Sequence, residues 1–173
     1  MQGRVRLTPL GAVLRGALAG AVGTLAMDLL WYRRYKRQGG DSGFVAWETS
    51  AGLANWEDAP APAQVGKRLV EGVFDRDLPP TRARLVNNVV HWATGVGWGA
   101  LFGLISGSVS RRPLWRGPGF GAGVWLQSYA VLAPAKLYEP IWCYELKTLA
   151  KDLSAHLVYG SATDIAFRLV ATL

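Results

Sequence analysis

The feature that most constrains this chain is a run of 26 residues, 85–110, that contains no Asp, Glu, Lys or Arg. An α-helix rises about 1.5 Å per residue, so the run is long enough to cross a hydrocarbon core of roughly 30 Å with some tilt. We therefore interpret it as a transmembrane helix.

The other apolar residues are also gathered into blocks. Half of the chain is apolar and 18% is charged, and the apolar residues collect near 10–32, 85–109, 117–137 and 153–173. The segment 33–84 is too polar to cross a membrane, so we expect it to lie outside the bilayer. Within it, residues 63–74 have helical spacing and predict a helix that lies on the membrane surface or packs on the protein itself. The sequence predicts an all-α fold: one integral membrane domain, 1–173, with four transmembrane helices.

The charge distribution supports a membrane rather than a nucleic-acid partner. The net charge is +7, but no basic helix, row of stacking aromatic residues or zinc-ligand spacing accompanies it. Arg and Lys lie beside the apolar blocks, and Trp and Tyr lie at the block ends, as at lipid headgroups. We expect the lipid bilayer to be a partner and nucleic acid not to be one. The basic residues leave the orientation in the membrane open.

Small residues recur every fourth position on two of the predicted helices. In the block 85–109 they are Gly95, Gly99, Gly103 and Gly107, and in the block 10–32 they are Ala12, Gly16, Gly20 and Thr24. Each row lies on one face of its helix and resembles a glycine zipper, which permits close approach of a second helix. The next positions on the two faces are Asp28 and His91. If the faces pack together in an antiparallel pair, these two side chains meet.

The alternating direction of four spans places several polar residues on one side of the membrane. These are Asp28, Asn87, Asn88, His91, Asp152 and His156. Ionisable residues in a membrane are functional candidates because their insertion is costly. Such residues also serve as hydrogen-bonding contacts between helices, and both interpretations stay open. We predict that Asp28, His91 and His156 converge inside the bundle.

The last block carries a polar stripe. Asp152, His156, Gly160, Asp164 and Arg168 are spaced by four, so they share one face of a helix whose other faces are apolar. Asp164 and Arg168 are expected to form an ion pair, which lowers the cost of burying either charge.

Several motifs resemble those of the YagU-like family of bacterial inner-membrane proteins. They are a Gly- and Ala-rich first helix, the segment from Asn88 to Trp92 that opens the second helix, the LWRG sequence at 114–117 and the final His-Leu-Val at 156–158. The resemblance covers most of the chain outside 38–75. It implies a small multi-spanning protein of the inner membrane and supplies no reaction.

The sequence leaves three kinds of function open. No phosphate-binding loop, nucleophile elbow, CxxC or HExxH motif occurs, so we identify no catalytic residue and favour a protein that is not an enzyme. The first interpretation is a structural or accessory protein that packs with itself or with partner membrane proteins. The second is a small transporter or proton pathway that uses the His and Asp residues. We expect no cofactor, but a third interpretation is a haem or metal site at His91 and His156, with Asp28 as a further metal ligand.

Overall fold

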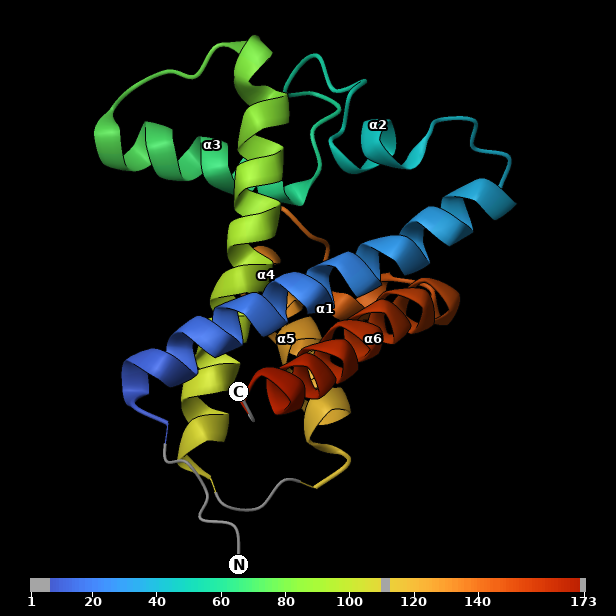
Figure 1. Cartoon of the computed structure of the whole chain (residues 1–173). Coiled ribbons are helices and arrows are strands. Elements are labelled where there is room, and N and C mark those ends of the chain that lie inside the picture. Colours follow the sequence, from blue (N-terminus) through green and yellow to red (C-terminus); the bar gives the residue numbers. More distant parts are fainter. Residues whose placement is uncertain (1–6, 110–112, 172–173) are drawn as a thin grey trace, which may run out of the picture.

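The protein is described by a computed structural model that covers residues 7–109 and 113–171. Its described residues form helices and loops and contain no β-strand, which confirms the predicted all-α class. The long helices are α1 (Pro9–Arg37), α4 (Ala83–Ser108), α5 (Arg116–Leu132) and α6 (Leu146–Val170) (Figure 1). The shorter helices α2 (Phe44–Glu48) and α3 (Ala61–Phe74) lie between α1 and α4 in the sequence, and single 3-10 turns occur at Pro80–Arg82 and Ile141–Cys143.

Helix α1 has clear start and stop signals. The Thr8 hydroxyl accepts a hydrogen bond from the Gly11 N–H at 3.1 Å, and Pro9 takes the first helical position, where its missing N–H is not needed. The helix continues beyond the predicted end at 32 because Arg and Lys are good helix formers and their charges suit the carboxyl end of a helix. It ends at Arg37, shortly before Gly39, whose φ of 90° an α-helix does not accommodate.

Two other boundaries differ from the prediction. Helix α5 ends at Leu132 and not near 137, because Pro134 has no N–H with which to continue the helical hydrogen bonds. Helix α6 begins at Leu146 and not near 153. Its first turns carry exposed lysines, so they are helical without being apolar. The predicted end at 173 and the basic residues 111 and 112 lie outside the described residues.

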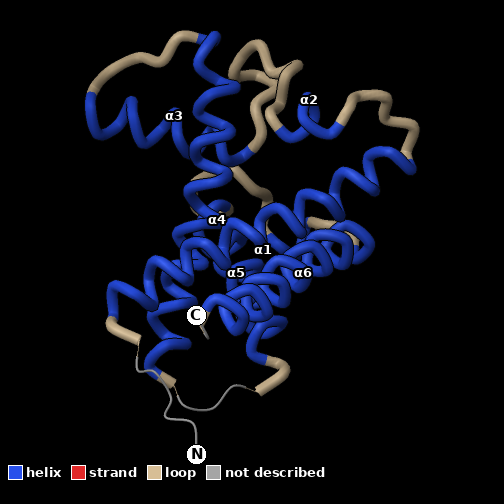
Figure 2. The backbone as a smooth tube through the Cα atoms, viewed as in Figure 1, coloured by secondary structure: helices blue, strands red, loops and turns tan. Residues whose placement is uncertain are grey.

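The long helices pack in the spatial order α4, α1, α6, α5, and each neighbouring pair is antiparallel (Figures 1 and 2). For α1 and α6, the direction is seen from contacts at both ends. Arg15 near the start of α1 donates to the Val170 carbonyl at the end of α6, at 3.0 Å. Arg34 near the end of α1 donates to the Lys151 carbonyl near the start of α6, at 2.8 Å.

Aromatic rings join the two outer helices of this row. Phe120 of α5 lies 4.8 Å from Phe102 of α4, measured between ring centroids, and Phe102 lies 5.8 Å from Phe167 of α6. Phe102 and Phe167 are buried together with Ala19 of α1. This layer of rings forms the hydrophobic core and closes the space between α4 and α5.

The segment between α1 and α4 folds over one end of the bundle (Figure 1). Helix α3 packs across α4, where Gly66 lies directly against Val86 and Val90. The structure therefore confirms a helix in residues 63–74 and shows it packed on α4, and its contact with a membrane surface stays a prediction. The start of α1 and the end of α6 lie at the opposite end, beside the connection between α4 and α5.

Two helices are long and apolar enough to cross a membrane: α1, and the helical stretch Pro80–Ser108 that includes α4. They correspond to the first two spans predicted from the sequence. Their outer surfaces and those of α5 and α6 are considered with the proposed function below.

Candidate functional site

The small-residue faces of α1 and α4 pack directly on each other. A methyl group added at Gly16 or Gly20 would collide with the backbone of α4 at Gly99, and one added at Gly103 would collide with Gly16. Gly95 lies against Thr24 in the same way. Because positions increase along α1 as they decrease along α4, the two helices are antiparallel with their backbones in contact.

This register brings Asp28 and His91 together. The Nε2 atom of His91 lies 3.0 Å from the Oδ2 atom of Asp28, although the residues are 63 positions apart. Asp28 is 4% exposed. A buried carboxylate needs a hydrogen-bonding or charged partner, and the imidazole supplies it.

A third ionisable group, which the sequence did not indicate, completes this cluster. Glu48, the last residue of α2, accepts a hydrogen bond of 3.1 Å from the indole N–H of Trp92. One ligand atom each from Asp28, Glu48 and His91 lies within 4.8 Å of the other two. Burial raises the pKa of the Glu48 carboxyl above its usual value, and the charge of Asp28 raises it further, whereas His91 and the Trp92 hydrogen bond oppose the rise.

The two predicted asparagines bind the turn that follows α2. The Nδ2 atom of Asn87 donates to the Ser50 hydroxyl at 3.0 Å, and that of Asn88 donates to the Thr49 carbonyl at 2.9 Å. Asn87 is buried, and its Oδ1 atom has no hydrogen-bond partner. Both residues therefore fix the segment that carries Glu48 against α4.

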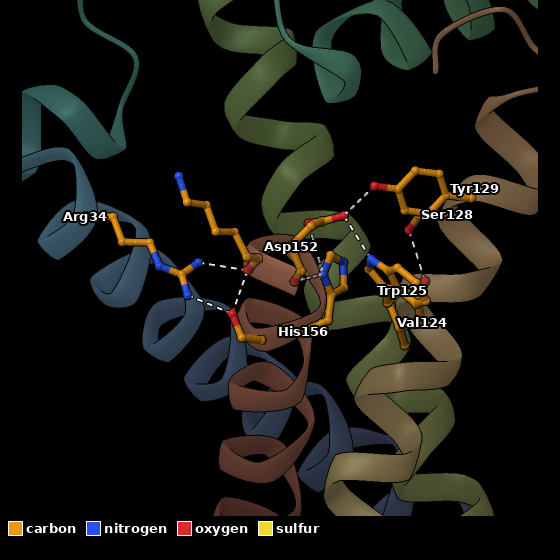
Figure 3. A network of polar contacts seen from close by, with 9 residues as sticks. Arg34, Val124, Trp125, Ser128, Tyr129, Asp152 and His156 are labelled. Atoms are coloured by element: carbon orange, nitrogen blue, oxygen red, sulfur yellow. Dashed lines mark hydrogen bonds and ion pairs between the residues drawn. The ribbon is translucent and has the colours of Figure 1, made fainter. Parts of the chain in front are cut away.

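The second histidine has its own carboxylate. Figure 3 shows the side chain of Asp152 between His156, Trp125 and Tyr129. The Nδ1 atom of His156 lies 3.3 Å from Asp152 Oδ1 and 3.0 Å from the Asp152 main-chain oxygen. Trp125 and Tyr129, both from α5, donate to Asp152 Oδ2 at 3.1 and 3.0 Å. The carboxylate is thus held by three side chains.

A cavity of about 480 Å³ lies between the long helices, with α3 over it. His91 and His156 both line it, as do Asp152 and Tyr138. Burial raises the pKa of the Tyr138 hydroxyl, so this group is neutral at physiological pH. The remaining walls are mainly apolar and aromatic, for example Trp98. We predicted that Asp28, His91 and His156 converge inside the bundle. In the structure Asp28 contacts His91 beside the cavity, and His156 lines the same cavity from α6.

The other end of the bundle holds a separate charged cluster. Asp164 of α6 accepts hydrogen bonds from Arg168 at 2.7 Å, as the four-residue spacing predicts, and from Arg116 of α5. Asp164 is 4% exposed, and Arg116 also lies over the ring of Phe102. These residues do not line the cavity, so we assign them to helix packing.

The predicted packing glycines all lie at the contact between α1 and α4. Gly16, Gly20, Gly99 and Gly103 meet backbone atoms across the α1–α4 contact, and Gly95 and Gly107 meet the side chains of Thr24 and Ala12 across the same contact. A second contact of this kind, between α5 and α6, is formed by Gly117, Gly121 and Gly160. Gly117 and Gly121 are four residues apart, and this spacing was the signal that could have identified them.

With this geometry established, the chain was compared with known proteins. No family model, curated protein or solved structure matches it. The resemblance to the YagU-like family stays a prediction, and the functional argument depends on the site itself.

Sequence reasoning missed three parts of the site. Glu48 lies in a short helix within a polar segment, so no periodicity marked it. Trp125 and Tyr129 form a four-residue pair on α5, but their shared partner comes from α6. Arg116 lies at a helix start among other basic residues and gave no sign of a buried ion pair.

Proposed function

We propose that the chain is a four-span membrane protein, placed in the bacterial inner membrane by its YagU-like motifs, that moves protons, alone or with a small solute, through the cavity lined by His91 and His156. Membrane insertion is supported by the outer face of α1. Its exposed large residues are all apolar for five turns, and they are Leu10, Leu14, Leu18, Val22, Leu25 and Leu29. Contiguous apolar surface of this length suits lipid rather than water.

The outer surfaces of the last two helices support their insertion as well. Leu126 of α5 is 57% exposed and Ile165 of α6 is 59% exposed. Helix α5 has 17 residues, which gives a length of about 25 Å, at the lower limit of helix lengths that span a bilayer. The polar stripe of α6 faces its neighbours through Asp152, His156 and Asp164, so the cost of placing it in lipid is reduced.

The small-residue faces do not favour the accessory interpretation over transport. They pack against each other within one chain, so they require no second protein. The observation that carries our proposal is the pair of histidines at one cavity, each beside its own carboxylate: His91 lies 3.0 Å from Asp28, and His156 lies 3.3 Å from Asp152. Imidazole changes charge near neutral pH, and an adjacent carboxylate stabilises its protonated form, as a proton relay requires.

The cavity is bounded at both of its ends. On the side of the chain termini, the rings of Phe102, Phe120 and Phe167 separate it from the Asp164 cluster. On the other side, α3 contributes Ala61, Pro62 and Val65 to its wall. Passage through the protein therefore requires the ring layer to part, and we expect transport to depend on motion of α4 relative to α5.

Proton flux into liposomes tests this proposal. The purified protein is reconstituted with a pH-sensitive dye inside, and an imposed potassium diffusion potential drives protons inward. We expect flux above that of empty liposomes, reduced at least about tenfold by His156→Ala or by Asp152→Asn, because each change removes a proton-binding group. Thr94→Ala is the matched control, since Thr94 lines the same cavity but does not titrate. Absence of flux, or unchanged flux in both His156→Ala and Asp152→Asn, would contradict the proposal.

A further inference from the structure

The cluster of Asp28, Glu48 and His91 has the composition of a metal site. It offers one imidazole nitrogen and two carboxylate oxygens, and these atoms lie within 4.8 Å of one another. Around a tetrahedral ion with bonds of about 2.1 Å, ligand atoms lie roughly 3.4 Å apart. Side-chain rotations that move these atoms by about 1 Å therefore bring all three into contact with one ion.

The charges of the cluster call for a cation. Two ionised carboxylates carry two negative charges, and His91 offsets at most one of them. Within residues 7–109 and 113–171, neither Asp28 nor Glu48 forms an ion pair with Lys or Arg. The nearest arginine on the same face of α4, Arg84, instead binds the carbonyl and hydroxyl of Thr49. A buried excess of negative charge is costly, and a bound cation removes that cost.

Asn87 provides an independent observation. It is 7% exposed, and its Oδ1 atom has no hydrogen-bond partner. Asn87 lies one helical turn before His91 on the same face of α4, and its Nδ2 atom binds Ser50, two residues after Glu48. Its oxygen thus belongs to a side chain on the face of α4 that carries His91, and an amide oxygen is a ligand that divalent cations accept.

The surrounding hydrogen bonds also fit a metal site. Metal-binding carboxylates are held by neighbouring donors, and the Trp92 indole N–H donates to Glu48 at 3.1 Å. A nitrogen and two carboxylate oxygens suit Zn²⁺ or Mn²⁺, whereas Mg²⁺ and Ca²⁺ prefer oxygen ligands alone. The set resembles catalytic zinc sites in its count of three side-chain ligands, which leaves a fourth position for Asn87 or water.

We propose that Asp28, Glu48 and His91 bind one divalent transition-metal ion, with Zn²⁺ as the best fit, and that this ion fastens α2 to the α1–α4 pair. The three ligands come from three helices that otherwise meet only through small residues and side-chain contacts. The site lies beside the cavity, and Asp28 and Glu48 do not line it. With the ion bound, His91 no longer takes up a proton at its ligating nitrogen, so the proton pathway then depends on His156 and Asp152, the two residues that the flux experiment changes.

Binding of Zn²⁺ itself provides the test. The full chain is purified in detergent, treated with a chelator and titrated with Zn²⁺ by calorimetry, and bound metal is counted by elemental analysis. We expect one ion per chain and a higher thermal unfolding temperature in its presence. Glu48→Gln should weaken Zn²⁺ binding by at least about tenfold, and Trp92→Phe, which removes the hydrogen bond to Glu48, by about tenfold.

Two control variants make the result specific. Glu57→Gln changes an exposed acid in the same polar segment, and His156→Gln changes the other histidine. Both should bind Zn²⁺ like the unaltered chain. Failure of the unaltered chain to bind Zn²⁺, or equal affinity in Glu48→Gln and Glu57→Gln, would overturn the site. Because the titration is done without a membrane gradient, its outcome is independent of the flux experiment.

Discussion

At the scale of single residues, the buried charges of this protein are held in small groups. Asp28 meets His91, Asp152 meets His156, and Asp164 meets two arginines. Arg15, which interrupts the first apolar block, binds the Val170 carbonyl at the end of α6, where a cation also suits the helix dipole. Each of these charged residues thus has a specific partner, as the low dielectric of the interior requires.

The Asp164 cluster gives a prediction about stability. Asp164→Asn removes the negative charge between Arg116 and Arg168 and leaves two positive charges close together in a buried place. We expect the variant to lose about 3 kcal/mol of unfolding free energy, measured by denaturant unfolding in detergent. Asp77→Asn, at an exposed position, is the control and should leave stability unchanged. Equal stability of the two variants would show that the cluster contributes nothing.

At the scale of helices, close backbone contact decides the arrangement. Helices α1 and α4 approach through Gly16, Gly20 and Gly99, and α5 and α6 approach through Gly121 and Gly160. Without side chains in between, the backbones reach contact distances that Leu or Val would prevent, and van der Waals packing replaces the hydrophobic effect as the driving force in lipid. The cavity persists on the side of α4 and α5, where rings and not glycines meet.

Two glycines of α4 provide a matched test of this packing. A methyl group at Gly99 would collide with the backbone of α1, whereas one at Gly97 would meet open space. We expect Gly99→Ala to destabilise the protein by about 2 kcal/mol, because the helices must separate. Gly97→Ala should change the stability by less than about 1 kcal/mol and in the favourable direction, because Ala is the better helix former. Thermal unfolding of both variants checks the difference, and a stable Gly99→Ala protein would refute the close contact.

At the scale of the whole molecule, the four long helices form an up-and-down bundle with a polar cap. The start of α1, the end of α4, the start of α5 and the end of α6 share one end, and α2, α3 and the α5–α6 connection share the other. The charged residues of the segment between α1 and α4 therefore remain at one end, away from the apolar outer faces of the helices. This division is expected for a protein that crosses a bilayer.

Cysteine labelling tests whether α5 and α6 cross the membrane. In a chain with Cys143→Ser, single cysteines at Leu126 and Ile165 face outward from the middle of the two helices. We expect both to react with a water-soluble maleimide far more slowly than a cysteine at the exposed loop position Asp58, because thiols in hydrocarbon remain protonated and meet little reagent. Equal reaction rates in membranes would exclude the four-span arrangement.

The sequence by itself determined the helical class, the four apolar blocks and the level at which Asp28 and His91 meet. These properties follow from hydropathy and from the helical period, which are local along the chain. A row of small residues on each of the two helices was enough to set their register. Only one antiparallel alignment brings both small faces into contact along their full length.

The tertiary structure alone decided which distant groups complete the sites. Glu48 reaches Asp28 and His91 because the segment after α1 folds back on α4, and Arg116 reaches Asp164 because α5 packs on α6. The shared cavity of the two histidines likewise depends on how the long helices pack, because His91 comes from α4 and His156 from α6. Such contacts join residues far apart in the sequence, and they are set by the packing of whole helices, for which no local pattern exists.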